Sequence, residues 1–233
     1  MVVERLIVEE NNNAELVYQH VTRYEFAKEF VCGRRVLDIA CGSGYGAAVL
    51  KAAGATSILG IDISDKAVDY AREHYGNSDI SFTVGSAENL SAYGDFDIVI
   101  SFETIEHLER PEKFLAEVTR SLAPKGILII STPVREHGTL RDKPKNSYHI
   151  REWSRDEFQA LLQQYFNVVD VYGQYNFKKW FPYSRKLQRL FFKYFFPHYF
   201  EAIERYPVMP EPPKYAGFRF DMALILAICK TAV

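Results

Sequence analysis

Acidic side chains and glycines follow one another early in this chain in an order that suits the binding of a nucleoside. Residues 36–46 read VLDIACGSGYG, an apolar run that contains Asp38 and leads into three glycines spaced two apart. Glycine lets the backbone turn tightly and lets a ligand approach without a Cβ in the way. A second apolar run ends at Asp62, sixteen residues after the last of these glycines. A carboxylate at a strand end can accept hydrogen bonds from both hydroxyls of a ribose, so the pattern predicts a nucleotide-like ligand.

The spacing of the glycines separates two classes of cofactor site. Dinucleotide sites use Gly-x-Gly-x-x-Gly, whereas Gly42, Gly44 and Gly46 form Gly-x-Gly-x-Gly after an acidic residue in the strand. This segment resembles the first motif of the class I S-adenosylmethionine-dependent methyltransferases. The resemblance implies S-adenosyl-L-methionine as cofactor and S-adenosyl-L-homocysteine as product. The early third glycine disfavours the other cofactor class, a nicotinamide-dependent oxidoreductase.

The resemblance assigns a role to each part of the expected cofactor pocket. Asp38 is expected to meet the ammonium group of the methionine moiety, or else only to bind backbone amides of the glycine turn. Asp62 is expected to bind the ribose, and Ile63 the adenine face. Ser86 stands where the family often has an aspartate, so the adenine amino group is left to Ser86 and the neighbouring backbone. The predicted cofactor residues are Tyr24, Asp38, Ala40, Gly42, Gly44, Asp62, Ile63, Ser86, Ala87, Glu88, Ser101 and Phe102.

A helix expected at residues 15–29 precedes the first strand. Similar enzymes often place aromatic or basic residues of such a helix over the methionine end of the cofactor. Tyr24 and Arg23 are the candidates for this role. Packing alone is the alternative interpretation of these side chains.

Candidate catalytic groups follow the fourth expected strand. If a helical turn starts there, Glu103, Glu106 and His107 lie at i, i+3 and i+4 on one face. Histidine suits a general base near neutral pH, which transfer to oxygen usually needs. Glu-x-x-Glu-His is similar to a turn in small-molecule O-methyltransferases of quinone biosynthesis. It also resembles clusters that hold a divalent metal, but the pattern is common in related methyltransferases, and we predict no metal.

A second candidate base lies in the long loop after the fifth expected strand. His149 and Tyr148 begin a segment that reads YHIREW. His149 is expected either to act as base or only to hold the loop in place. The basic residues of this loop are expected to grip an anionic acceptor, or else to form a solvated surface. The predicted catalytic residues are His107, His149 and Glu103.

Strand-like and helix-like segments alternate along the chain and position these groups. The alternation predicts an α/β fold with a mainly parallel sheet and helices on both faces. The resemblance implies a seven-stranded, mostly parallel, Rossmann-like sheet whose last two strands form a hairpin. The expected strands are 35–39, 57–61, 80–84, 96–101, 126–131, 167–172 and 221–230, and the expected helices after the first are 44–53, 65–75, 111–122 and 154–165.

Residues 174–220 form an aromatic insertion before the last strand of a single domain that we expect over residues 1–233. The insertion contains sixteen aromatic residues and nine Lys or Arg against three Glu. It is expected to be a lid on the substrate side or an oligomer interface. The alternative is that residues 184–196 form a basic amphipathic helix that makes a peripheral membrane contact.

Composition narrows the classes of partner and location. The net charge of −2 gives no general reason to expect nucleic acid as a partner. The three cysteines have no metal-ligand spacing, and the first residues lack the pattern of a signal peptide, so we expect a cytoplasmic protein. A small molecule is the expected acceptor, and a homo-oligomer stays open.

The sequence therefore predicts a methyltransferase that modifies a hydroxyl of a small molecule such as a sugar, a polysaccharide precursor or a secondary-metabolite precursor. Alternatives are transfer to nitrogen or carbon, and a membrane-associated enzyme that acts on a quinone or a lipid-linked acceptor. A non-catalytic module that keeps the fold to bind a partner is the alternative outside the enzymes. An intact set of Asp38, Gly42, Gly44 and Asp62 argues against that module.

Overall fold

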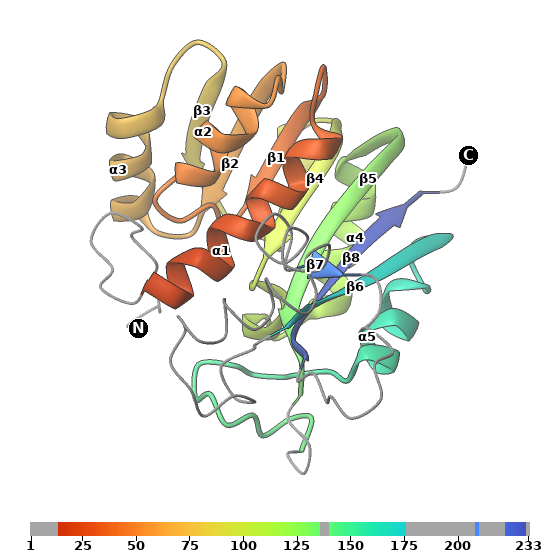
Figure 1. Ribbon diagram of the computed structural model, residues 1–233. Helices are drawn as coiled ribbons and strands as arrows, with labels where there is room; N and C mark the ends of the chain where they lie inside the picture. The colour runs from red at the N-terminus through yellow and green to blue at the C-terminus, as the bar shows by residue number, and fades with distance from the viewer. Residues whose placement is uncertain (1–13, 136–139, 176–207, 210–221, 232–233) are drawn as a thin grey trace, which may run out of the picture.

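The computed structural model describes residues 14–135, 140–175, 208–209 and 222–231 (Figure 1). Within these residues the strands form one eight-stranded sheet in the order β3-β2-β1-β4-β5-β8-β6-β7. The seven-stranded prediction is confirmed, and β7 adds a strand of two residues at the edge. The strands are β1 Arg35–Ile39, β2 Ser57–Asp62, β3 Ile80–Val84, β4 Phe96–Phe102, β5 Leu122–Pro133, β6 Val168–Tyr175, β7 Val208–Met209 and β8 Met222–Lys230.

Strand direction fixes where a ligand can bind. Strands β1 to β5 pair in parallel, and β8 runs antiparallel between β5 and β6. The chain order reverses at β1, because β2 lies on one side of it and β4 on the other. Open α/β sheets bind ligands outside the carboxyl ends of the strands at such a reversal. We call the carboxyl ends of β1, β2, β4 and β5 the carboxyl edge.

Helix boundaries follow the local signals in the sequence. Ser64 caps α3, with its side chain accepting from the amide of Ala67, and Pro111 opens α4. Ser154 and Glu157 form the predicted capping box at the start of α5. The helices are α1 Ala14–Ala27, α2 Tyr45–Ala52, α3 Asp65–Tyr75, α4 Pro111–Ser121 and α5 Arg155–Leu162, with 3-10 turns η1 Lys28–Phe30, η2 Ser91–Tyr93 and η3 Ile105–His107.

Both faces of the sheet are covered, because successive side chains of a strand point to opposite sides. Val36 belongs to the core on the side of α1, α2 and α3, whereas Leu37 belongs to the core on the side of α4 and α5. Figure 1 shows α1 crossing in front of the central strands and α4 behind them. Burial on both faces explains why β1 has an almost continuous apolar sequence.

The insertion predicted at 174–220 lies largely outside the described residues. Only its first two residues and β7 are described, and the segment 184–196 is not. Its roles as lid, interface or membrane helix therefore stay predictions, as does the single domain over 1–233. None of the helices in the described ranges has the length and apolar character needed to cross a bilayer.

Tyr24 fills the space that a side chain at Gly46 would need. The Tyr24 ring packs edge-on against Tyr45 and Phe102, with ring centroids 5.3 Å and 5.1 Å away. A Cβ on Gly46 would lie 2.2 Å from carbons of the Tyr24 ring. The third glycine of the motif thus lets α1 pack against α2.

We therefore expect Gly46→Ala to destabilise the protein, although alanine favours a helix over glycine by about 0.5–1 kcal/mol. Overpacking of this kind costs about 1–3 kcal/mol, which outweighs the helix gain. In a Tyr24→Ala background the same change is expected to be neutral or stabilising, because the ring is gone. Urea unfolding of the two single variants and the double variant measures this coupling. An equal loss of stability in both backgrounds would contradict the packing described here.

Candidate active site

The turn between β1 and α2 is held by a carboxylate from the neighbouring strand. Ala40, Gly42 and Gly44 all have positive φ, at 56°, 55° and 84°. Asp62, the last residue of β2, accepts the N–H of Gly42 on Oδ2 at 3.0 Å and the N–H of Ser64 on Oδ1 at 2.9 Å. Each carboxylate oxygen keeps a second lone pair, so Asp62 can still accept from a ligand.

The two predicted cofactor glycines face different surroundings. A Cβ on Gly42 would meet no heavy atom within 4 Å, whereas a Cβ on Gly44 would lie 2.7 Å from Cβ of Ala71 and 2.8 Å from the ring of Phe82. Gly42 therefore borders open space at the carboxyl edge. Gly44 is required because α3 and β3 pack directly against the turn.

Asp38 lies beneath the same turn and is fully buried. The Tyr24 hydroxyl lies 3.2 Å from both of its carboxylate oxygens. Burial raises the pKa of Asp38 to about 7, the Tyr24 hydrogen bond opposes the shift and Asp62 adds to it. Asp62, not Asp38, accepts the N–H of Gly42. The alternative in which Asp38 binds amides of the turn therefore has no support at that residue. A cation beside Asp38 would compensate the buried carboxylate.

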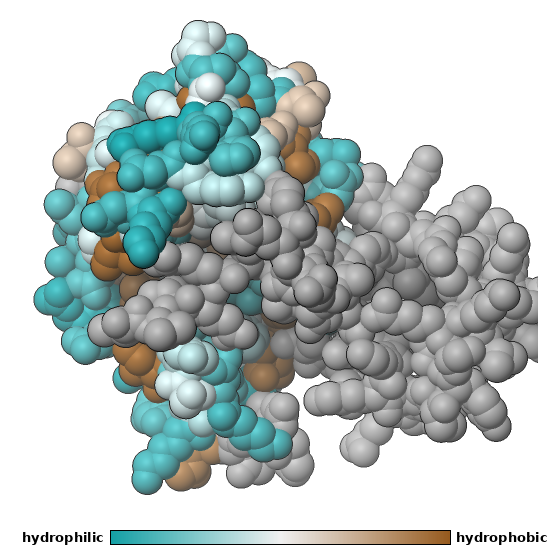
Figure 2. Space-filling view, turned by 90° about the vertical axis from the view of Figure 1, so that its left-hand side faces the viewer, coloured by the Kyte–Doolittle hydropathy of each residue, from teal (hydrophilic) through white to brown (hydrophobic). Residues whose placement is uncertain are grey.

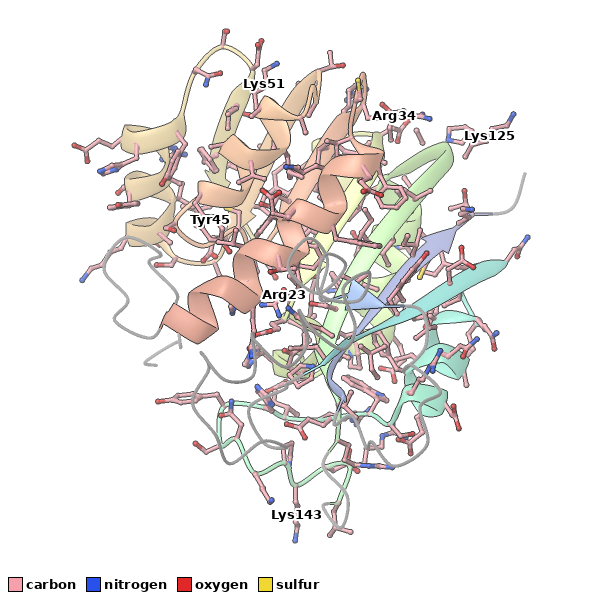
Figure 3. All side chains as sticks on the ribbon, in the orientation of Figure 1. Arg23, Arg34, Tyr45, Lys51, Lys125 and Lys143 are labelled. Carbon is pink, nitrogen blue, oxygen red and sulfur yellow. The ribbon has the colours of Figure 1, made fainter. Side chains whose placement is uncertain are left out.

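Arg23 presents an unused edge of its guanidinium group next to this site. Its side chain is 1% exposed and lies on the side of α1 that faces the sheet (Figure 3). Nη1 donates to Gln174 at 3.1 Å and pairs with Glu103 at 2.7 Å. Nε and Nη2 are buried and have no hydrogen-bond partner in the described part of the chain. These two N–H groups lie along one edge of the guanidinium plane and match the two oxygens of a carboxylate.

Apolar side chains are exposed at the ends of β2 and β3. Ile63 is 69% exposed and Val84 is 44% exposed. Ser86 accepts the N–H of Glu88 at 3.2 Å, and Glu88 pairs with Arg110. An exposed apolar surface beside a polar turn suits a flat heterocycle such as adenine.

The remaining cofactor candidates lie after β3 and at the end of β4. Ala87, which follows β3, is half-buried. Ser101 and Phe102 are buried at the end of β4, where Phe102 packs against Tyr24. Together the two aspartates, the guanidinium edge and the apolar surface fit the ribose, ammonium, carboxylate and base of an adenosyl amino acid.

Glu103 does not lie on one helical face with Glu106 and His107, so that prediction is wrong. The 3-10 turn begins at Ile105, and Glu103 precedes it with a positive φ of 50°. Its carboxylate instead pairs with Arg23 and lies 3.4 Å from Nε2 of His20. Burial would raise the pKa of Glu103, but Arg23 and His20 outweigh it and lower the pKa to about 2. Glu103 is therefore ionised at neutral pH.

Glu106 is a fully buried carboxyl group. Thr132 donates to Oε2 at 3.1 Å, and Oε1 has no hydrogen-bond partner within the described residues. Burial, with the nearby charge of Glu103, raises the pKa of Glu106 well above its usual value. Its backbone carbonyl accepts the N–H groups of Ile150 and Arg151 at 2.8 Å and 3.2 Å. These two hydrogen bonds hold the loop after β5 against η3.

His107 has the geometry of an oriented base. Its Nδ1 lies 2.9 Å from the carbonyl oxygen of Tyr148, and the side chain is 36% exposed. A carbonyl can only accept, so this bond places the proton on Nδ1 and the lone pair on Nε2. Nε2 lies 4.0 Å from Oε1 of Glu106.

His149 is bound at both ring nitrogens. Nδ1 lies 2.6 Å from Oε1 of Glu152, and Nε2 lies 3.0 Å from Nδ2 of Asn146. The N–H of Tyr148 donates to Oδ1 of Asn146, which turns the amide donor toward His149. The ring packs edge-on against His107 at 5.0 Å. This arrangement favours the interpretation in which His149 holds the loop in place.

Among the described residues, one group of side chains is close enough to hold a metal ion. Ligand atoms of Glu106, His107 and His149 lie within 4.8 Å of one another. His149 is the third member of this group, in place of Glu103, which the sequence spacing had grouped with Glu106 and His107. The high pKa of Glu106 weighs against metal binding, because metal ligands must be deprotonated.

Sequence reasoning did not find the residues that hold the site together. Gln174 links Arg23 to the carbonyl oxygen of Gln19, and Glu152 and Asn146 fix His149. Glu152 at i+3 from His149 was a visible signal. No sequence pattern indicated Gln174, because only the folded chain brings it next to α1.

Proteins of known family are similar to this chain in sequence. A methyltransferase domain family model matches residues 37–130. A probable S-adenosylmethionine-dependent methyltransferase of Mycolicibacterium smegmatis is 34% identical over 160 residues, which cover 68% of this chain and 62% of that protein. These similarities support a class I S-adenosylmethionine-dependent methyltransferase. A ubiquinone biosynthesis O-methyltransferase of Thiobacillus denitrificans is 37% identical over 106 residues, 44% of this chain and 45% of that protein. The chain thus spans less than two thirds of the length of each relative.

Solved structures show the same fold at low identity. Phosphoethanolamine N-methyltransferase 2 of Haemonchus contortus, in complex with S-adenosyl-L-methionine, has a TM-score of 0.60 and 15% identity, with 92% of this chain and 52% of that chain covered. The YcgJ protein of Bacillus subtilis has a TM-score of 0.59 and 20% identity, with 91% of this chain and 98% of that chain covered. These likenesses establish the fold.

The pKa of Asp38 predicts a pH dependence of ligand affinity. Below pH 7 Asp38 becomes protonated, and an ammonium group bound beside it would lose its counter-charge. We expect the affinity to fall as the pH decreases from 7.5 to 5.5, approaching tenfold per pH unit. Calorimetry across this range measures it, and Asp38→Asn is expected to flatten the curve. Equal slopes for the two proteins would show that Asp38 does not face the ammonium group.

Proposed function

We propose that this protein transfers a methyl group from S-adenosyl-L-methionine to a hydroxyl group of a small-molecule acceptor. The observation that carries the proposal is the glycine turn with Asp62 beside it and Asp38 beneath it at the carboxyl edge. In this assignment Asp62 binds the ribose hydroxyls and Asp38 the ammonium group. Arg23 binds the carboxylate with Nε and Nη2, and Ile63 covers the adenine.

The cofactor supplies a sulfonium methyl group that is already activated for displacement. The protein therefore has to hold the acceptor in line, about 3 Å from the methyl carbon. His107 supports transfer to oxygen, because the Tyr148 carbonyl keeps its Nε2 basic. It would remove the acceptor proton as the new bond forms. Glu103, held by Arg23, borders the same edge as an ionised group.

The relatives support the class of acceptor that we propose. Ubiquinone biosynthesis O-methyltransferases among the relatives are compatible with a small hydroxylated acceptor, such as a sugar, a secondary-metabolite precursor or a quinone precursor. Transfer to nitrogen or carbon is the alternative, and product analysis separates the three. We also propose that the protein works in the cytoplasm, where its cysteines would stay reduced.

Binding of S-adenosyl-L-homocysteine tests the cofactor assignment. We expect a dissociation constant in the micromolar range or tighter, which corresponds to a binding free energy on the order of −8 kcal/mol. Asp62→Ala is expected to weaken binding at least about a hundredfold, since it removes both the ribose acceptor and the clamp on the turn. Arg23→Lys, which keeps the charge but loses the planar edge, is expected to weaken it about tenfold.

Asp69→Ala, at an exposed position of α3, is the matched control for these measurements. Urea unfolding checks that each variant is folded. If calorimetry gives no heat with S-adenosyl-L-methionine or its product, the assignment fails.

A second test concerns His107. Formation of S-adenosyl-L-homocysteine is followed with a panel of sugars, phenols and lipid extracts to find an acceptor. With that acceptor, His107→Gln is expected to lower kcat about 100- to 10,000-fold and to remove the acid limb of its pH profile. Affinity for S-adenosyl-L-homocysteine should stay unchanged. His74→Gln, at an exposed histidine of α3, is the control. An unaltered pH profile in His107→Gln would exclude His107 as the base.

A further inference from the structure

The loop between β5 and α5 projects from the carboxyl edge, away from the rest of the sheet. The part of this loop at residues 140–151 is named the 140–151 loop. It lies at the lower end of the molecule in Figure 1, and Figure 3 shows Lys143 at its tip. Its last residues are fastened to Glu106, whose carbonyl accepts the N–H groups of Ile150 and Arg151. The loop therefore has a defined position next to His107.

Exposed apolar side chains gather on this loop. The large hydrophobic side chains exposed in the described part of the protein are Ile63, Val84, Leu140, Tyr148 and Ile150. Ile63 and Val84 belong to the proposed adenine surface. Leu140, Tyr148 and Ile150, which are 66%, 48% and 42% exposed, have no such role. Exposed apolar residues that cluster in this way mark a surface that is covered by something else.

Basic side chains lie on the same loop as these apolar side chains. The loop contains four basic residues and one acid, whereas the whole chain has a net charge of −2. Arg141, Lys143 and Lys145 are exposed. The acid, Asp142, accepts from Nε of Arg151 at 3.0 Å, so its charge is partly neutralised. At the lower end of the molecule in Figure 2, hydrophilic and hydrophobic residues lie side by side.

We propose that the 140–151 loop docks on the surface of an anionic lipid bilayer. Leu140, Tyr148 and Ile150 enter the headgroup region, and Lys143 and Lys145 meet lipid phosphates. Apolar side chains that insert and bases that attract anionic lipid together give peripheral binding. Docking places the edge that carries His107 next to the membrane.

Nucleic acid fits this surface less well. A phosphate backbone would use the bases but not the exposed Leu140 and Ile150, and base stacking needs aromatic side chains, of which the loop has one. A bilayer uses both kinds of side chain at once. The proposal stands apart from methyl transfer, because it needs neither cofactor nor acceptor.

Vesicle sedimentation with the full chain tests the proposal. The probes are phosphatidylcholine vesicles and vesicles in which about a third of the lipid is phosphatidylglycerol. We expect binding to the anionic vesicles and little to the neutral ones. Leu140→Ser with Ile150→Ser is expected to lower the partition coefficient about tenfold. Lys143→Gln with Lys145→Gln is expected to lower it similarly and to remove the preference for anionic lipid.

Arg34→Gln with Lys125→Gln is the matched control, because these exposed bases lie at the opposite end of the sheet in Figure 3. This variant should bind vesicles like the unchanged protein. Calorimetry with S-adenosyl-L-homocysteine checks that each variant keeps its fold. If the proposed cofactor is wrong, the unchanged protein also gives no heat, and that result is independent of vesicle binding. Absence of binding to anionic vesicles overturns the proposal. Vesicle binding by the Leu140/Ile150 double variant that equals binding by the unchanged protein also overturns it. Retention on single-stranded DNA that is lost in the Lys143/Lys145 double variant and kept in the Leu140/Ile150 double variant overturns it as well.

Discussion

The hydrogen bond from the amide of Gly42 to the carboxylate of Asp62 is the interaction on which the rest of the site depends. It joins β1 to β2 at the point where the chain passes through three residues with positive φ. Without it a carboxylate at a strand end and a strained turn would be separate features. With it they form one surface, under which Asp38 is buried. The position of α1 follows in turn, because Tyr24 reaches Asp38 only across Gly46.

The surroundings of three carboxyl groups at this edge shift their pKa values by different amounts and in different directions. Asp38 is buried with a hydroxyl as partner, and its pKa of about 7 leaves it poised for a cation. Glu103 has a guanidinium partner that lowers its pKa to about 2, whereas burial raises the pKa of Glu106, whose partner is a hydroxyl, well above its usual value. Groups whose pKa values are pushed apart in this way are typical of sites that bind and transfer charge.

The sequence predicted the sheet and most helix ends, because apolar runs, glycines and caps are local signals. It also placed Asp38, Asp62 and the glycines at one edge, since parallel strands share their carboxyl ends. It failed at Glu103, because a residue with positive φ before a 3-10 turn breaks the helical spacing assumed there. The partners of His149 were missed for another reason. Asn146 and Glu152 act through a loop whose path is set by contacts with η3, and no periodicity encodes those contacts.

A crystal structure with S-adenosyl-L-homocysteine bound tests the central claim most directly. The ribose hydroxyls should lie within hydrogen-bond distance of Asp62, the ammonium group beside Asp38 and the carboxylate along the Nε and Nη2 edge of Arg23. The sulfur should face the space in front of His107. A product molecule bound elsewhere on the protein, or bound at this edge with its ribose away from Asp62, would contradict the account.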